Sequence, residues 1–242
     1  MAETPFDEFK IEEFRFSDRR AKIVYPNGNF NGKLMFKTEY QNAFPEFEVE
    51  MIRRGYAWCF IQSRNRWATD EEIDIKADFV KFVAEKLGIE AKCILVGMSC
   101  GGLQAAKLAE RYPELVSVLY LDAPVLNILS MAGLGECTDP AVPVFWRELV
   151  NAYGFDKSTV VNFRKSPIDN MEPLIENDIP VVMLYGTADN VVLYNENGKV
   201  LEDFYKERGG RIDVIAKTMA AHHPHGLPSD PELLIELVEK YL

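Results

Sequence analysis

Histidine and cysteine are scarce in this chain. Its 242 residues include three histidines, His222, His223 and His225, and four cysteines without CxxC spacing. So few cysteines in a chain of this length argue against a disulfide framework or a structural zinc site. We therefore expect reduced thiols and a cytoplasmic location.

Long apolar runs and an excess of basic residues are also missing. The longest apolar candidate, residues 116–134, is interrupted by Asp122, Pro124 and Asn127, so it falls short of the ~18 residues of a membrane span. The first eight residues are acidic and do not predict a signal peptide. The formal net charge is −11, which argues against nucleic acids or anionic membranes as partners.

The remaining composition is that of a globular domain, with 48% hydrophobic and 27% charged residues. A predicted hairpin over residues 9–25 is followed by short apolar segments that alternate with helical patterns. We expect strands near residues 32–38, 56–61, 92–97, 116–121, 180–185 and 211–217, and helices near 44–54, 70–87, 101–112, 195–208 and 230–242. This order predicts an α/β fold, a doubly wound, mostly parallel sheet with helices on both faces.

One segment breaks the alternation of strands and helices. Residues 126–166 contain three glycines, two prolines and an apolar stretch around Phe145, and the segment is too long for a plain connection. We expect a single domain over residues 1–242, with this segment as a small cap or lid.

A GxSxG sequence, residues 97–101, joins an apolar strand to a helix. A serine on such a sharp turn has a strained backbone, and Gly97 and Gly101 remove the side chains that would collide there. The following helix begins with free N–H groups, so the N–H of Cys100 is one expected oxyanion donor. Ser99 is the candidate nucleophile; the alternative is an ordinary glycine turn.

A serine nucleophile needs a base, and the three histidines lie together in residues 222–225. If Ser99 is catalytic with a histidine base, that base is one of these three, and we favour His222. Two alternatives remain open: a metal site formed by the histidines, and a solvated histidine loop. No Asp, Glu or Cys lies between Asp213 and Asp230 to complete a metal site, so we expect no bound metal.

Two aspartates at strand ends could orient the histidine. Asp189 follows an apolar strand and precedes His222, which gives the chain order Ser, Asp, His of a nucleophile-elbow hydrolase. Asp122 is the competitor, with a role as a loop cap beside the site as its other interpretation. We favour Asp189.

The remaining site residues are less well defined by the sequence. The second oxyanion donor should follow the strand at residues 33–38, where we favour the N–H of Tyr40. The helix N-terminus at Cys100 predicts a lowered thiol pKa and a reactive side chain, against the alternative of an inert neighbour. Trp67, Trp146 and Tyr153 are expected to line an acyl or sugar-ring pocket, unless they are plain core.

These segments together resemble the α/β-hydrolase superfamily, and more narrowly its bacterial prolyl-oligopeptidase-like and dienelactone-hydrolase-like members. The resemblance extends from about residue 33 to the C-terminus and rests on residues 97–103, 122–124, 166–170, 185–189 and 222–227. The chain departs from the common pattern at residues 219–221, where members often have Gly-x-Gly, and at Leu193, where many have proline. The elbow carries serine where dienelactone hydrolases proper use cysteine.

The resemblance implies a serine hydrolase with Ser99, Asp189 and His222 as its triad, a small-molecule ester as substrate and no cofactor. Some similar bacterial sequences accompany polysaccharide-degrading enzymes, which points to carbohydrate acyl esters as one substrate class. Two alternatives remain open: a non-catalytic hydrolase-fold protein that binds a small ligand, and a peptidase or acyltransferase with the same triad. The acyl group, the alcohol and the oligomeric state are not determined by the sequence.

Overall fold

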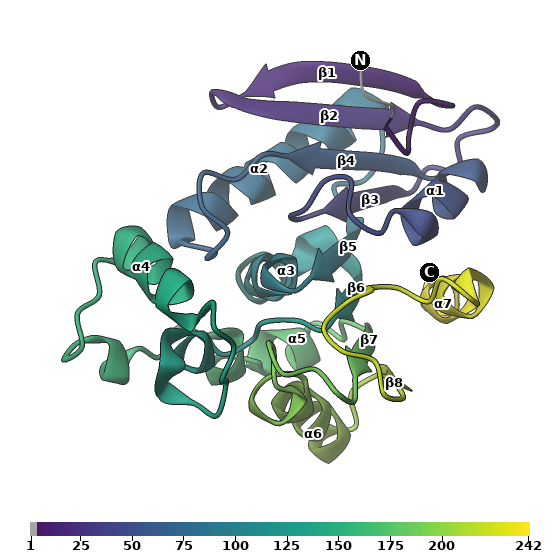
Figure 1. The fold of residues 1–242 in the computed structure, drawn as a ribbon. Helices are drawn as coiled ribbons and strands as arrows, with labels where there is room; N and C mark the ends of the chain where they lie inside the picture. Colours follow the sequence, from purple (N-terminus) through teal and green to yellow (C-terminus); the bar gives the residue numbers. More distant parts are fainter. Residues whose placement is uncertain (1–3) are drawn as a thin grey trace.

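Eight strands form one sheet in the order β1-β2-β4-β3-β5-β6-β7-β8 (Figure 1). The computed structural model describes residues 4–242. The strands are β1 (Lys10–Phe16), β2 (Arg19–Tyr25), β3 (Leu34–Lys37), β4 (Ala57–Ile61), β5 (Cys93–Met98), β6 (Val116–Asp122), β7 (Val181–Gly186) and β8 (Ile212–Lys217). Strand β2 is antiparallel to β1 and β4, and all other pairs are parallel. This confirms the predicted fold class.

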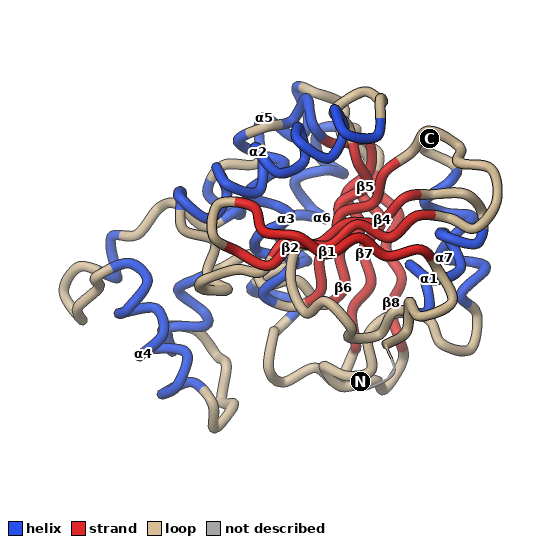
Figure 2. Tube along the Cα trace, turned by 90° about the horizontal axis from the view of Figure 1, so that it is seen from above, coloured by secondary structure: helices blue, strands red, loops and turns tan. Residues whose placement is uncertain are grey.

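Within residues 4–242, seven α-helices accompany the sheet. They are α1 (Glu46–Arg53), α2 (Asp70–Leu87), α3 (Cys100–Arg111), α4 (Val142–Tyr153), α5 (Glu172–Glu176), α6 (Gly198–Arg208) and α7 (Pro231–Glu239). Apolar residues of α1 and α7 pack with one face of the sheet, and those of α2, α3 and α6 pack with the other (Figures 1 and 2). Every residue of the central strands β3, β4 and β5 is buried, which explains the continuous apolar runs of β4 and β5; β3 contains the buried Lys37.

Helix α2 has clear start and stop signals in the sequence, so its predicted boundaries are accurate. Three acidic residues, 70–72, occupy its first turn, where their negative charges interact favourably with the positive end of the helix dipole. Gly88 ends it with a left-handed backbone, φ 67°, a conformation that glycine adopts without steric cost. The predicted and observed limits, residues 70 and 87, agree.

The insertion between β6 and β7 contains α4, which lies apart from the sheet (Figure 2). Helix α4 was not predicted from the sequence, and neither was the short α5. Polar contacts attach α4 to the loop after β4: the hydroxyl of Tyr153 donates to the carbonyl of Trp67 at 2.7 Å, and the indole N–H of Trp67 donates to Glu148 at 2.9 Å. The insertion is therefore anchored beside the ends of the central strands.

None of the helices within residues 4–242 is both long enough and apolar enough to cross a membrane.

We predict that Gly102→Ala destabilises the protein. A Cβ at this position of α3 would lie 2.8 Å from the Cα of Pro124 and closer still to its Cβ. Such overpacking costs about 1–3 kcal/mol, which exceeds the roughly 1 kcal/mol that alanine contributes to a helix interior. Urea unfolding should show a lower midpoint. Gly28→Ala is the control, because nothing lies within 4 Å of its added Cβ; equal stability of the two variants would contradict the prediction.

Candidate active site

Ser99 occupies the single position between the end of β5 and the start of α3. Its backbone has φ 52° and ψ −122°, a strained conformation for a residue with a side chain. Three hydrogen bonds hold it there. The N–H of Ser99 donates to the carbonyl of Asp122 at 3.0 Å, and its own carbonyl accepts from Gly102 at 2.9 Å and Val125 at 3.0 Å. The surrounding backbone thus maintains the strain and presents the hydroxyl at the strand end.

The two glycines of the motif are required by close packing around Ser99. A Cβ on Gly97 would lie 2.8 Å from the Cβ of Ala105 and 2.8 Å from the carbonyl oxygen of Gly101. A Cβ on Gly101 would lie 3.2 Å from the hydroxyl oxygen of Thr38, which itself donates to the Gly101 carbonyl at 2.7 Å. The spacing of the motif therefore has the steric origin that the sequence suggested.

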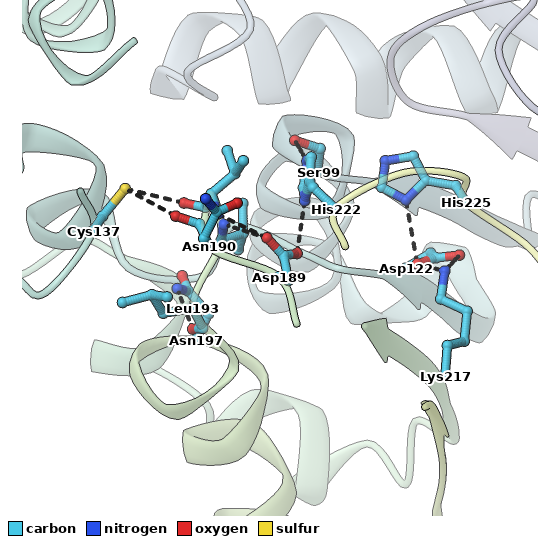
Figure 3. A network of polar contacts seen from close by, with 12 residues as sticks. Ser99, Asp122, Cys137, Asp189, Asn190, Leu193, Asn197, Lys217, His222 and His225 are labelled. Carbon is cyan, nitrogen blue, oxygen red and sulfur yellow. Dashed lines mark hydrogen bonds and ion pairs between the residues drawn. The ribbon is translucent and has the colours of Figure 1, made fainter. Parts of the chain in front are cut away.

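His222 lies between Ser99 and Asp189 (Figure 3). Its Nε2 is 3.0 Å from Oγ of Ser99, and its Nδ1 is 2.7 Å from Oδ2 of Asp189. The side chains of His222 and Asp189 are both buried. With Nδ1–H donated to the carboxylate, Nε2 is left with a lone pair that can accept the Ser99 hydroxyl proton. The structure thus brings together the three residues that the sequence singled out.

The carboxylate of Asp189 is oriented by its own loop. Its Oδ1 accepts the backbone N–H groups of Val191 and Val192, both at 2.9 Å, which leaves Oδ2 for His222. Burial raises the pKa of Asp189, but the hydrogen bond and charge of His222, together with these two N–H groups, outweigh burial and lower the pKa below its usual value. Asp189 is therefore held as a carboxylate.

The loops that carry Asp189 and His222 are joined directly. The N–H of Ala188 donates to the carbonyl of Ala220 at 2.9 Å, and the N–H of Met219 donates to the hydroxyl of Thr187 at 2.7 Å. Gly186 permits this approach, because an added Cβ would overlap the carbonyl oxygens of residues 220 and 221. The distance between acid and histidine is thus set by backbone contacts.

Asp122, the competing acid, makes a separate network with the same histidine loop (Figure 3). Its carboxylate is fully buried and lies 3.2 Å from Nδ1 of His225 and 3.0 Å from Nζ of Lys217. It also accepts the N–H of Gly226, and Lys217 donates to the carbonyl of Pro224 at 3.0 Å. The structure pairs Asp189, and not Asp122, with His222.

A cavity of about 370 Å³ opens at Ser99. Besides Ser99 and the three histidines, its lining comprises Tyr40, Ala43, Phe44, Arg66, Met98, Phe145 and Val191. Arg66 bonds through Nε and Nη2 to Glu148 of α4, each at 2.9 Å, while Nη1 lies 3.5 Å from the hydroxyl of Tyr40. The insertion therefore contributes Phe145 to the cavity and holds its one arginine.

The aromatic residues expected in the pocket lie elsewhere, since none of the three is part of this cavity lining. Trp67 is buried, with its indole N–H on Glu148, and Tyr153 stacks on Phe155 at 5.0 Å between ring centroids. Trp146 is half-buried on α4. Phe44, Arg66 and Phe145 line the cavity instead, and sequence reasoning missed them. The sequence does not show which side of the inserted segment faces the site, so it does not distinguish Phe145 from its neighbour Trp146.

The two expected oxyanion donors belong to different segments, the start of α3 and the loop after β3. Cys100 is the first residue of α3, so its N–H has no partner four residues back in the helix. Tyr40 follows the neighbouring strand β3 and has a positive φ of 56°. Its N–H is 3.5 Å from Oε1 of Glu39, too long for a strong hydrogen bond.

The expected lowering of the Cys100 pKa is wrong. The Cys100 side chain is buried, and burial raises the pKa of its thiol to about 11, although the positive charge of Arg66 opposes this. A helix N-terminus favours a thiolate only where the sulfur can be solvated or paired. Cys100 is therefore an inert neighbour of Ser99.

We predict that iodoacetamide leaves Cys100 unmodified in the native protein at pH 7.5. All four cysteines are free and buried, and the raised pKa leaves Cys100 as a thiol, which is a poor nucleophile. Peptide mapping by mass spectrometry measures the modification. Unfolded protein is the control and should react at all four positions; stoichiometric labelling of native Cys100 would show that the thiol is accessible after all.

Comparisons with known proteins agree with this architecture. The sequence profile of the alpha/beta hydrolase fold matches residues 54–162. No curated protein matches the sequence. Among solved structures, Pyrococcus horikoshii acylaminoacyl peptidase is similar, with a TM-score of 0.73 at 16% identity, covering 97% of this chain and 42% of that one.

A puromycin-hydrolyzing peptidase of Mycobacterium tuberculosis is also similar, with a TM-score of 0.75 at 12% identity, covering 99% of this chain and 40% of that one. The chain thus spans less than half the length of these structures, and at such identities the likeness concerns the fold. Together with the profile match and the sheet topology, it shows that the chain has the α/β-hydrolase fold.

Proposed function

We propose that the protein is a serine hydrolase that cleaves a carboxylic ester through an acyl-enzyme intermediate. The observation that carries the proposal is the continuous contact from Ser99 through His222 to Asp189, at 3.0 and 2.7 Å. A serine in a strained turn, a histidine with a free Nε2 and a buried carboxylate behind it are the three parts that nucleophilic acyl transfer needs.

Each residue has one role in the proposed reaction. Ser99 attacks the ester carbonyl as Nε2 of His222 takes its proton, and His222 then returns that proton to the leaving alcohol. Asp189 holds the imidazole and stabilises its charged form. The N–H groups of Cys100 and Tyr40 stabilise the oxyanion, and water releases the acyl group from Ser99 by the reverse sequence.

A peptidase is the second candidate, because two structurally similar proteins are peptidases. The same triad can cleave amides, but the amine leaves less readily than an alcohol. Both similar chains are more than twice as long, and the likeness concerns only the part of each that this chain covers. We therefore favour an ester, with carbohydrate acyl esters as the first class to test.

An ester and amide panel tests this choice. Acetylated sugars, simple alkyl esters and aminoacyl amides should be compared at equal concentration, with kcat/KM as the readout. Faster turnover of esters supports the proposal. Faster turnover of aminoacyl amides would show that the protein is a peptidase instead. The absence of turnover with every class would favour a non-catalytic binding protein.

We predict that Ser99→Ala and His222→Ala each abolish covalent labelling by a fluorophosphonate probe. The probe reacts with an activated serine, and loss of either member of a triad lowers the rate by about 10⁴-fold or more. Gel fluorescence against time measures labelling. Ser117→Ala, at the opposite end of β6 from Asp122, is the matched control and should label like the parent protein. Labelling that survives in Ser99→Ala would place the nucleophile elsewhere.

We predict that Asp189→Asn lowers kcat far more than Asp122→Asn. The first change removes the carboxylate that holds Nδ1–H of His222, an effect of about 10⁴-fold in similar triads. The second change disturbs only the contacts of Asp122 with His225, Lys217 and Gly226, which support the histidine loop. Steady-state kinetics on the best ester gives both values. A larger loss in Asp122→Asn would mean that Asp122 is the acid of the triad.

A further inference from the structure

The three histidines form a nearly equilateral triangle beside Ser99. The ring centroids of His222, His223 and His225 are separated by 4.8, 4.9 and 5.0 Å, and the ring planes cross at 63–89°. One ring nitrogen from each histidine lies within 4.8 Å of those of the other two. The triad uses only one of these rings, so the cluster exceeds what serine catalysis needs.

Two of the three imidazoles are oriented by carboxylates. Nδ1 of His222 faces Asp189 at 2.7 Å, and Nδ1 of His225 faces Asp122 at 3.2 Å. In protein metal sites, a ligating histidine almost always turns its second ring nitrogen to such a group, which fixes the tautomer and raises the basicity of the ligand. In Figure 3 the ring of His225 turns its other nitrogen away from Asp122. Nε2 of each ring is therefore the nitrogen left for a ligand, and that of His222 lies 3.0 Å from the Ser99 hydroxyl, which an ion would displace or share.

We propose that the three histidines bind a divalent transition-metal ion of the zinc type, and that this ion reversibly inhibits the enzyme. Imidazole nitrogen is a preferred ligand of zinc, and three histidines with an open fourth position make a known type of tetrahedral site. The carboxylates of Asp122 and Asp189 behind the rings favour a cation, and Lys217 at 3.0 Å from Asp122 offsets part of that charge.

The site has to contract for the ion to bind. Nitrogen ligands at 2.0–2.1 Å from a tetrahedral zinc are roughly 3.3 Å apart, whereas the present nitrogens lie up to 4.8 Å apart. His223 supplies most of the movement, because it is exposed while His222 and His225 are buried. The hydroxyl of Ser99, 3.0 Å from Nε2 of His222, or a water takes the fourth position.

Inhibition follows because one atom, Nε2 of His222, would be both a zinc ligand and the catalytic base. This step rests on the proposed function. Nε2 of His222 cannot hold a metal ion and accept the Ser99 proton at the same time. Zinc binding therefore removes the base from Ser99, and chelation restores it. The ion is an inhibitor in this proposal and takes part in no step of ester cleavage.

Imidazole NMR tests binding without reference to activity. The chain has only three histidines, so a long-range ¹H–¹⁵N spectrum of the imidazoles reports on every one of them. Titration with Zn²⁺ alone should shift all three rings together, and the shifts should saturate near one equivalent. Shifts confined to His223, or no shifts at one equivalent, would overturn the site.

Two variants test which side chains hold the ion. His223→Ala should weaken Zn²⁺ binding by more than about tenfold. Loss of a residue that only hydrogen-bonds to a metal ligand already costs about that much, and His223 is a ligand itself in this proposal. Cys137→Ser is the control and should bind Zn²⁺ like the parent, because it removes the thiol near the Asp189 loop and leaves the histidines intact. Weakening in Cys137→Ser instead would assign the ion to the thiol.

Fluorophosphonate labelling then separates the two proposals. Labelling that is blocked by Zn²⁺ and restored by EDTA supports inhibition. Labelling that continues with zinc bound overturns inhibition but leaves the serine hydrolase intact. Absence of labelling in metal-free protein counts against the hydrolase, while the NMR titration still decides whether the three histidines form a metal site.

Discussion

Asp122 links the turn that carries Ser99 to the loop that carries His222, and this link helps to set the distance between the two segments. Its backbone carbonyl accepts the N–H of Ser99, and its buried carboxylate accepts the N–H of Gly226 in the loop that carries His222. Lys217 adds a second attachment by donating both to Asp122 and to the carbonyl of Pro224. A buried carboxylate with all these partners cannot shift without leaving polar groups unpaired, so the loop and the elbow keep a fixed separation.

The strained backbone of Ser99 is maintained by the segments packed around it. A positive φ at a residue with a side chain is unfavourable by itself and persists where the surroundings over-determine it. Here the sheet supplies Asp122 on one side, the helix supplies Gly102 on the other, and glycines remove the competing side chains. Asp189 is oriented in the same way, by two N–H groups of its own loop. The candidate site is thus preorganised by backbone contacts.

The insertion adds chemistry that the sheet alone lacks. Helix α4 supplies Phe145 to the cavity and Glu148 to Arg66, so the one arginine of the lining is held by a segment that lies apart from the sheet. The three histidines line the same cavity. The cavity wall thus comes largely from the insertion and the loops, whereas Ser99 and Asp189 follow the ends of the central strands β5 and β7.

The sequence by itself determined the alternation of buried strands and amphipathic helices, and it singled out Ser99, Asp189 and His222 as candidates, because these depend on local spacing, turn chemistry and chain order. With only three histidines, all within four residues, the choice of base needed almost no tertiary information. The tertiary structure alone decided that the Asp122 carboxylate contacts His225, that Arg66 and Phe145 line the cavity, and that burial raises the pKa of the Cys100 thiol. These outcomes depend on burial and on contacts between segments distant in the chain, and no local pattern encodes which face of an inserted helix or which of two strand-end carboxylates meets a given ring.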